Sequence, residues 1–391
     1  MRPHKRKRIL AATCILCMAW GPGSVLRAYP PDPDNAALVY YQAFLLLVPL
    51  ESEQKEAVAE FSRGERELTD EIRETVGQFR SAIEYSLTAS QMRTCSWGLR
   101  LSLGFNASLP HLAQLRSLSR VLLADARIRA ADGAWREAFE RCLAVKRIGK
   151  HVGDDVIISM LVAGSLDGAA NEVIGDLLGA MPADEEMLAW LKSELATLSS
   201  DPLTAGRTLE YEREVAMETM RPENRELLIH VFEGMGTQIT PKQVAQVDEQ
   251  LLARNRDHYD RFITSIQTIL STPGTYEERY QKLNRLVARM EESASDEDST
   301  IAAALAPRFD SVFSRQALIE ASANATQAAV EIYRVRARTG RLPADLPSDL
   351  PKDPFSGRDF EYERTDSGFV LRCGGKDLSK DTVHEYVFSV N

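Results

Sequence analysis

Two histidines of the sequence lie close to carboxylates, and these residue types could hold a metal ion or transfer a proton. His151 precedes the pair Asp154–Asp155 by three residues, and His258 lies between Asp257 and Asp260. An imidazole beside a carboxylate can bind a divalent metal or act as an acid–base pair. Both clusters fall at helix ends or on polar helix faces, where solvated or capping roles are favoured. We therefore predict no metal site.

Three glutamates stand at alternate positions of one predicted helix, namely Glu210, Glu212 and Glu214. One or two carboxylates are what an exported enzyme needs to cleave cell-wall glycans. In a chain with 57 acidic residues, however, such proximity is expected by chance. The sequence contains no HExxH, GxSxG, P-loop or GxGxxG motif before a helix, and its one CxxC lies within the first 20 residues. We therefore predict no catalytic or cofactor-binding residue, and the chain leans towards not being an enzyme.

Trp97 is flanked by Arg93 and Arg100, and the three side chains could form a stacking site for a ligand. The favoured interpretation is that Trp97 anchors the core.

The charge of the chain is unevenly distributed. The formal net charge is −10, yet six of the 47 basic residues lie in the first 28 residues, which contain no acid. Without them the balance is 41 − 57, or −16. A chain that is this acidic overall is a poor candidate for binding nucleic acid or anionic lipid. The aromatic content of 7% disfavours a β-sandwich or barrel.

The N-terminus has the layout of a secretory signal peptide. A basic head, Arg2–Arg8, precedes the apolar run Ile9–Trp20, and cleavage after Ala28 would remove both. We expect residues 1–28 to be this signal and the protein to be extracytoplasmic. The alternatives are an uncleaved membrane anchor and a lipid anchor at Cys14 or Cys17. No later window has 18 uninterrupted apolar residues, so we expect no transmembrane helix in the mature chain.

Export would leave Cys95, Cys142 and Cys373. In an oxidising compartment one pair could form a disulfide, with one thiol left over. Three small buried residues are an equally good interpretation.

The rest of the chain predicts an irregular α-helical domain over residues 35–338, with solenoid-like helical hairpins. Asn35 can cap the first helix, and apolar residues then recur at helical spacing as far as Arg338. Val156–Ala180 is apolar nearly all round and should be a central helix. Asp201-Pro202, Thr240–Gln243 and Thr275–Glu278 carry the chemistry of helix starts.

After Thr339 the period changes. The segment Thr339–Pro354 contains four prolines and cannot be regular helix. Alternating residues around the turn Asp366–Gly368 predict a β-hairpin, and Glu385–Val390 can add a third strand. Residues 339–391 should therefore form a small antiparallel β module.

Two segments resemble known families. Ala126–Leu143 is similar to one helix–turn–helix step of a tetratricopeptide array, although no 34-residue repeat is present. Gly340–Leu346, Lys352–Gly357, Phe360–Tyr362 and Gly368–Leu371 together resemble the C-terminal module of the major pseudopilins of type II secretion. The pilin head has no counterpart, and Gly374–Asp381 is a thin match to the family's calcium loop.

The whole layout resembles a group of exported helical proteins of planctomycete-like bacteria, with matching residues at Asp34–Ala37 and Cys95–Trp97. That resemblance implies export and fold, without an activity. The leading hypothesis is a non-catalytic scaffold or binding protein of the cell envelope that holds a protein or envelope partner. The alternatives are an exported hydrolase of envelope polymers and a component of a secretion or pilus-like machine.

Overall fold

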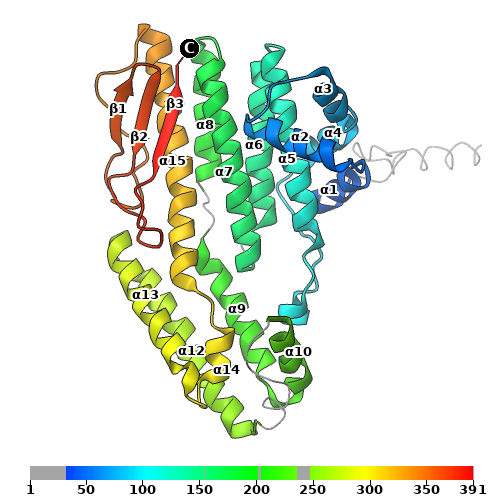
Figure 1. The fold of residues 1–391 in the computed structure, drawn as a ribbon, viewed down its shortest axis with the longest axis vertical. Helices are drawn as coiled ribbons and strands as arrows, with labels where there is room; N and C mark the ends of the chain where they lie inside the picture. The colour runs from blue at the N-terminus through cyan, green and yellow to red at the C-terminus, as the bar shows by residue number, and fades with distance from the viewer. Residues whose placement is uncertain (1–31, 154, 201–203, 236–246, 391) are drawn as a thin grey trace, which may run out of the picture. The chain divides into compact units, whose positions relative to one another are not determined.

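The computed structural model describes residues 32–153, 155–200, 204–235 and 247–390. It divides the chain into two units, Met1–Asp34 and Asn35–Asn391, and the fold below is that of the second unit. This unit is mainly helical with a small antiparallel sheet at its C-terminal end, which confirms the predicted fold class (Figure 1). The predicted signal segment 1–28 and the predicted helix starts at Asp201-Pro202 and Thr240–Gln243 lie outside the described residues.

The helices are α1 (Ala36–Leu45), α2 (Ser52–Arg63), α3 (Asp70–Gly77), α4 (Arg80–Ser90), α5 (Pro110–Ala131), α6 (Trp135–Val152), α7 (Ile157–Ala180), α8 (Glu185–Ser199), α9 (Ala205–Thr219), α10 (Arg225–Met235), α12 (Glu249–Ser271), α13 (Tyr276–Glu292), α14 (Thr300–Leu305) and α15 (Phe309–Thr339). Short 3-10 segments cover Leu101–Asn106, Pro222–Asn224 and Ser293–Ser295. The strands are β1 (Glu361–Thr365), β2 (Gly368–Arg372) and β3 (Glu385–Ser389).

Local chemistry explains where several helices begin and end. The Asn35 side chain accepts a hydrogen bond from the backbone of α1, which confirms the predicted cap. Gly64 ends α2 in the left-handed conformation, with φ of 79°, which a residue with a Cβ rarely adopts. Thr275 and Glu278 form the predicted capping box at the start of α13.

The helices α5, α6 and α7 pack against one another in sequence order, and α7 and α8 both pack against the long helix α15 (Figure 1). This is the central position that the apolar composition of α7 predicts. By length and composition alone, α7 is the one helix of the described residues that could cross a membrane. Over half of its most apolar window is buried within the protein, as in the core helix of a soluble domain.

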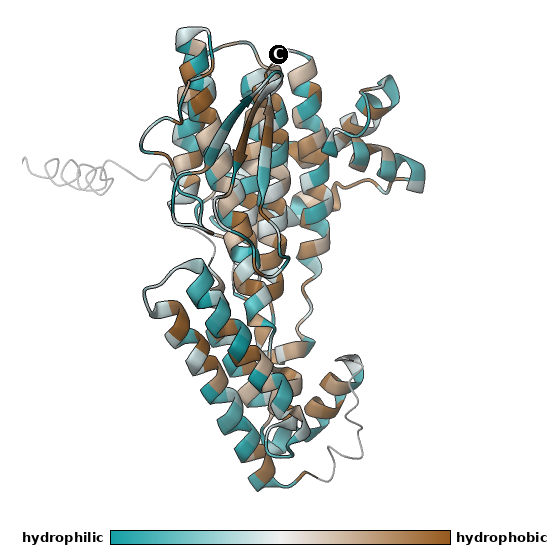
Figure 2. Cartoon of the chain, turned by 60° about the vertical axis from the view of Figure 1, so that its left-hand side comes forward, coloured by the Kyte–Doolittle hydropathy of each residue, from teal (hydrophilic) through white to brown (hydrophobic). Residues whose placement is uncertain are grey.

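Two hydrophobic cores stabilise the unit. The larger core joins α1–α8 to the later part of α15 and to the β module. The second lies among α9, α10, α12, α13, α14 and the start of α15. In Figure 2 the outer sides of α12 and α13 are largely hydrophilic, as expected for amphipathic helices that cover a core. Among the described residues, the buried members of both cores lie between Ala36 and Phe388.

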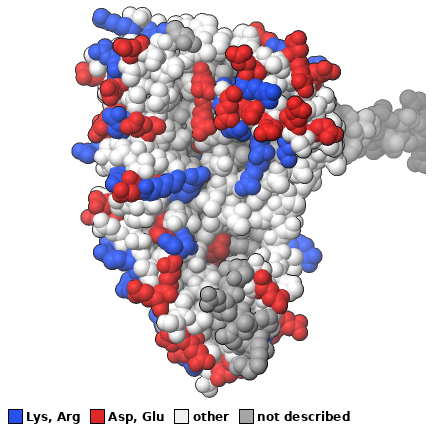
Figure 3. Space-filling view, in the orientation of Figure 1, with Lys and Arg blue, Asp and Glu red and all other residues white. Residues whose placement is uncertain are grey.

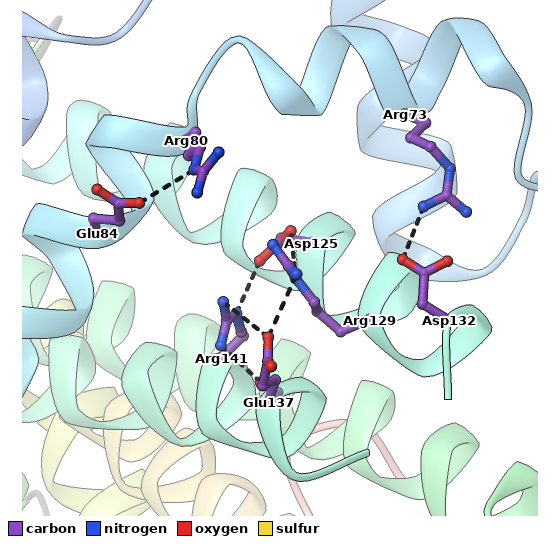
Figure 4. A network of polar contacts seen from close by, with 8 residues as sticks. All are labelled: Arg73, Arg80, Glu84, Asp125, Arg129, Asp132, Glu137 and Arg141. Carbon is purple, nitrogen blue, oxygen red and sulfur yellow. Dashed lines mark hydrogen bonds and ion pairs between the residues drawn. The ribbon is translucent and has the colours of Figure 1, made fainter. Parts of the chain in front are cut away.

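A buried ion pair ties α5 to α6. The guanidinium of Arg141 donates to Asp125 at 2.8 Å, and both side chains are at most one-tenth exposed. Arg129 and Glu137 complete the network around this pair (Figure 4). A paired charge of this kind helps to fix how two helices align, because a misaligned hairpin would bury the charges without partners.

The β module packs on the helices through one face of its sheet, which has the order β1-β2-β3 with both pairs antiparallel. The Phe369 ring of β2 lies 5.5 Å from the Tyr333 ring of α15. Gly179 of α7 lets β3 approach closely, since a Cβ there would lie 2.7 Å from the Ser389 carbonyl oxygen. The other face carries exposed side chains such as Val387.

Candidate functional site: a groove along helix α15

His151 lies in the last turn of α6, and hydrogen bonds to the protein occupy its ring. Its Nδ1 is 2.9 Å from the Tyr40 hydroxyl, and its Nε2 is 3.0 Å from the Met92 carbonyl oxygen. Because that carbonyl can only accept, we assign the proton to Nε2, and Nδ1 accepts from Tyr40. Burial lowers the pKa of His151, which favours this neutral form. Asp155 is exposed, and Asp154 lies outside the described residues.

Trp97 is a core residue, with 8% of its surface exposed. Its ring stacks on His111 and Tyr40, with ring centroids 4.6 and 5.5 Å away, and its Nε1 donates to a backbone carbonyl of α6 at 2.7 Å. Arg93 and Arg100 are exposed, and in the described structure neither makes a cation–π contact with this ring. Burial lowers the pKa of His111 to about 4, so that ring is neutral.

The three glutamates of α9 do not converge. Glu210 accepts a hydrogen bond from Gln267 of α12, whereas Glu212 accepts one from the backbone at the start of α7. Glu214 is exposed to solvent. Residues two apart on a helix point in different directions, which explains this divergence. Burial raises the pKa of Glu212, but no second carboxylate of the trio is brought to it.

The other histidine cluster, on α12, is also used by the fold. Asp260 forms an ion pair with Arg213 of α9 at 2.5 Å, and Asp257 is exposed. His258 is partly exposed on the same helix. Within the described residues, no group of three or more His, Cys, Asp or Glu side chains is placed to hold a metal ion.

Asp377, Ser379 and His384 of the β module form a cluster with Ser314 of α15, and these residue types are those of a catalytic triad. Their order is different from that of a triad. Asp377 accepts hydrogen bonds from Ser314 of α15 at 2.5 Å, from Ser379 and from His384 at 3.1 Å. In a hydrolase triad the histidine lies between serine and aspartate and takes the serine's proton. Here the Asp377 carboxylate lies between the serine hydroxyls and His384, so the histidine is not placed to take a proton from either serine. The cluster joins the β module to α13 and α15, since Tyr276 also faces it.

All three cysteines of the described chain are free thiols. Cys142 and Cys373 are buried, and burial raises the pKa of both. The structure therefore contains no disulfide among these three. Cys142 and Cys373 match the interpretation as small buried residues, whereas Cys95 is only partly buried.

A groove along α15 is the feature best suited to hold a ligand. One cavity of about 190 Å³ lies between α6, α7, α8 and α15. A second, of about 410 Å³, lies between α13, α15 and the turn Pro354–Gly357. Gln316 and Glu320 of α15 line both cavities, so the two form one surface, which we call the α15 groove. Its walls combine apolar side chains, such as Met160 and Ile319, with polar ones.

Glu320 is the carboxylate of the groove that no neighbour neutralises. It makes no hydrogen bond or ion pair with the described residues, although the neighbouring Gln316 and Asn324 are bonded to Ala205 and to the Lys352 carbonyl. Its side chain is exposed to solvent at the rim of the groove, while the surrounding protein displaces enough water to raise its pKa. A carboxylate in this state gains from a cation or a hydrogen-bond donor brought by a ligand.

The other carboxylate of the groove is already satisfied. Asp167 accepts from Lys146 Nζ at 2.6 Å through Oδ1, and from the Asn171 side-chain amide at 3.0 Å through Oδ2. Lys146 is buried and also donates to Asn171 Oδ1 at 2.7 Å. Charged side chains of both signs are interspersed over the face shown in Figure 3, without a large area of one sign.

Comparison with protein-family models, with curated proteins and with solved structures finds no match to this chain. Its function must therefore be argued from the groove itself. Sequence reasoning did not single out Gln316 or Glu320. No signal in the sequence could have found them, because Gln316 and Glu320 lie on the polar side of α15, where such residues are ordinary.

Proposed function

We propose that this protein is an exported, non-catalytic binding protein of the cell envelope, and that the α15 groove holds its protein or envelope partner. The observation that carries the proposal is the unpaired Glu320 against a partly apolar wall. Such a site favours a partner with a cationic group next to an apolar one, because pairing would offset the cost of removing water from the carboxylate.

An exported hydrolase of envelope polymers is the second candidate, since Asp167 and Glu320 line the same cavity. A glycosidase needs one protonated acid and one free carboxylate across the scissile bond. Glu320 suits the first role because its pKa is raised. Asp167 is poorly suited to the second role because both of its oxygens already accept hydrogen bonds. This difference favours the binding protein.

A role in a secretion or pilus-like machine depends on the resemblance of the C-terminal module alone. One face of its sheet is buried against α7 and α15, which leaves the outer face, with Val387, for any assembly contact.

Site-specific photocrosslinking tests the groove. A photoreactive residue in place of Ala323, which lines the groove, should capture a discrete partner in the envelope fraction, whereas one at the exposed Arg285 of α13 should not. The charge reversal Glu320→Lys should abolish the capture. Glu214→Lys is the matched control, since Glu214 is exposed and lies outside the groove.

Three outcomes separate the hypotheses. Equal capture at both positions, or capture that survives Glu320→Lys, would refute the groove as the binding site. Release of soluble fragments from isolated envelope polymers, lost in Glu320→Gln, would establish the hydrolase instead. Recovery of the chain in the cytosolic fraction with residues 1–28 intact would remove the premise of export.

A further inference from the structure

Helix α1 presents an apolar face to the outside of the protein. Leu38, Tyr41 and Leu45 follow one another at intervals of three and four residues and are all exposed, Leu45 to 86%. The opposite side of α1, which includes Tyr40 and Ala43, is buried in the larger core. No charged residue occurs between Asn35 and Leu50. Gln42 is also exposed on this face, so the face is largely but not wholly apolar. A largely apolar face of a surface helix is normally covered by another molecule, so the surroundings of this face should indicate its occupant.

The apolar surface continues past the end of α1 and reaches a pocket. Leu46 and Val48 are also exposed, and next to them a cavity of about 360 Å³ has apolar walls from Leu50 and Phe79, among others. Figure 3 shows few charged side chains on the part of this face that lies below α2 and beside α1. These residues form one continuous apolar patch. Most protein surfaces carry only single, scattered apolar side chains, so a continuous patch indicates a contact surface.

Two cations line this pocket, and no acid does. Lys55 of α2 and Arg120 of α5 are both exposed, and neither has an ion pair or hydrogen bond among the described residues. The glutamates that flank Lys55 in sequence, Glu53 and Glu56, do not line the pocket. The chain as a whole has more acids than bases. This pocket is lined by cations and no acid, so its local charge is opposite to that of the whole chain.

We propose that α1 and this pocket form a membrane-docking surface. Leu38, Tyr41 and Leu45 enter the interface of a lipid bilayer, and Lys55 and Arg120 bind the phosphate groups of anionic lipid. The surface comprises these residues together with Leu46 and Val48, and we call it the α1 face. It shares no residue with the α15 groove, so either proposal can fail without the other.

Charge complementarity is what favours lipid as the occupant. An uncharged helix face with leucine and tyrosine side chains, bordered by unpaired cations, has the composition of an interfacial membrane contact. The N-terminal sequence adds a second argument. The apolar run ends at Trp20, and α1, the first described helix after it, begins at Ala36, with fifteen residues between the two. Extended, those residues reach at most about 50 Å, so a retained anchor would hold α1 near the bilayer.

Vesicle flotation tests the α1 face. The protein should be residues 29–391, which contain both cores and lack the N-terminal apolar run. It should float with vesicles of phosphatidylcholine mixed with phosphatidylglycerol, and less with pure phosphatidylcholine. Leu45→Glu should weaken binding about tenfold or more, because a leucine side chain loses its burial. Val387→Glu is the matched control, since Val387 is an exposed apolar residue of β3.

A second pair of variants tests the cations. Lys55→Gln with Arg120→Gln should remove the preference for phosphatidylglycerol, a loss of about thirtyfold for two charges near an anionic surface. Lys282→Gln with Arg285→Gln changes the charge equally at exposed positions of α13 and should have no effect.

Several results would overturn the proposal. The first is that the parent protein does not float with the vesicles. The second is an equal loss of vesicle binding in Leu45→Glu and Val387→Glu, and the third is an equal loss of vesicle binding in the two double variants. A dimer in solution that Leu45→Glu converts to a monomer would instead identify a second copy of the chain as the occupant.

Discussion

Replacing Asp377 should detach the β module from the helices more than any other single change in that module. Its carboxylate is 2% exposed and accepts hydrogen bonds from Ser314 of α15 and from Ser379 and His384 of the module. The backbone N–H of Ser379 also donates to it, at 2.9 Å. Asp377→Ala removes the acceptor for these four donors at once, and also for the longer bond of 3.5 Å from the Tyr276 hydroxyl.

The size of the effect follows from which donors can find a new partner. The hydroxyls of Ser314 and Ser379 lie 3.0 Å apart and can bond to each other. His384 Nε2 and the Ser379 backbone N–H would remain without an acceptor, and each such buried group costs about 1–3 kcal/mol. We therefore expect Asp377→Ala to lower the free energy of unfolding by about 3–5 kcal/mol. Asp377→Asn keeps one acceptor oxygen and should cost about 1–3 kcal/mol.

The same hydrogen bonds predict a dependence on pH. Burial alone would raise the pKa of Asp377, but the bonds from Ser314, Ser379 and His384 outweigh it and lower the pKa from 3.8 to about 2. Since the pKa is lower in the folded state, this stabilisation is present above about pH 4 and is lost as the pH falls towards 2. It is worth at most about 2.5 kcal/mol. Asp377→Asn should therefore lose less stability than the parent protein across that range.

Urea denaturation, monitored by tryptophan fluorescence, measures both the loss of stability in each variant and its dependence on pH. Asp381→Asn is the control, because Asp381 lies in the same loop but is 85% exposed and pairs only with Lys376. It should change the free energy of unfolding by less than about 0.5 kcal/mol. An Asp377→Asn protein that is as stable as the parent at pH 7 would refute the reasoning. So would an equal change in the free energy of unfolding for Asp377→Asn and Asp381→Asn.

Two further predictions concern packing and the thiols. Gly179→Ala should destabilise the protein by about 1–3 kcal/mol, because the new Cβ meets the Ser389 carbonyl where β3 docks on α7. Gly77→Ala in α3 meets no atom within 4 Å and should be neutral or stabilising by up to about 1 kcal/mol, so equal thermal shifts would contradict this. Thiol labelling should be slow in the folded protein, because Cys142 and Cys373 are buried with raised pKa values. In denaturant without reductant, mass spectrometry should count three labelled thiols if the N-terminal segment is removed and five if it is retained, and fewer than three would indicate a disulfide.

The sequence alone was sufficient to predict several helix ends, because local residues determine them. The cap at Asn35 predicts the start of α1, the apolar run Val156–Ala180 predicts α7, and the capping box at Thr275 predicts the start of α13. The hairpin of β1 and β2 and the third strand were predicted for the same reason, since alternation and turn residues are local signals. The acidic, serine-rich stretch Glu291–Thr300 predicts an exposed loop, and this is wrong at both ends. Helix α13 continues to Glu292, a 3-10 segment covers Ser293–Ser295, and α14 begins at Thr300.

The partners of the polar side chains could not be predicted in this way. His151 and Tyr40 are 111 residues apart, and only the packing of α1 against α4 and α6 brings the hydroxyl to the ring. The carboxylates suggested by sequence spacing diverge around α9, while Glu320 stands alone in a groove whose walls come from five separate helices and a turn.

The sequence by itself thus determined the mainly helical fold and the β module, because composition, period and caps act over a few residues, whereas the signal peptide at the N-terminus stays a prediction. The tertiary structure decided which polar groups are neutralised and which are left over. Asp167 finds Lys146 across two helices, whereas Glu320 finds no such partner among the described residues. That difference depends on how helices distant in sequence pack together, and it is what places the candidate binding site on α15.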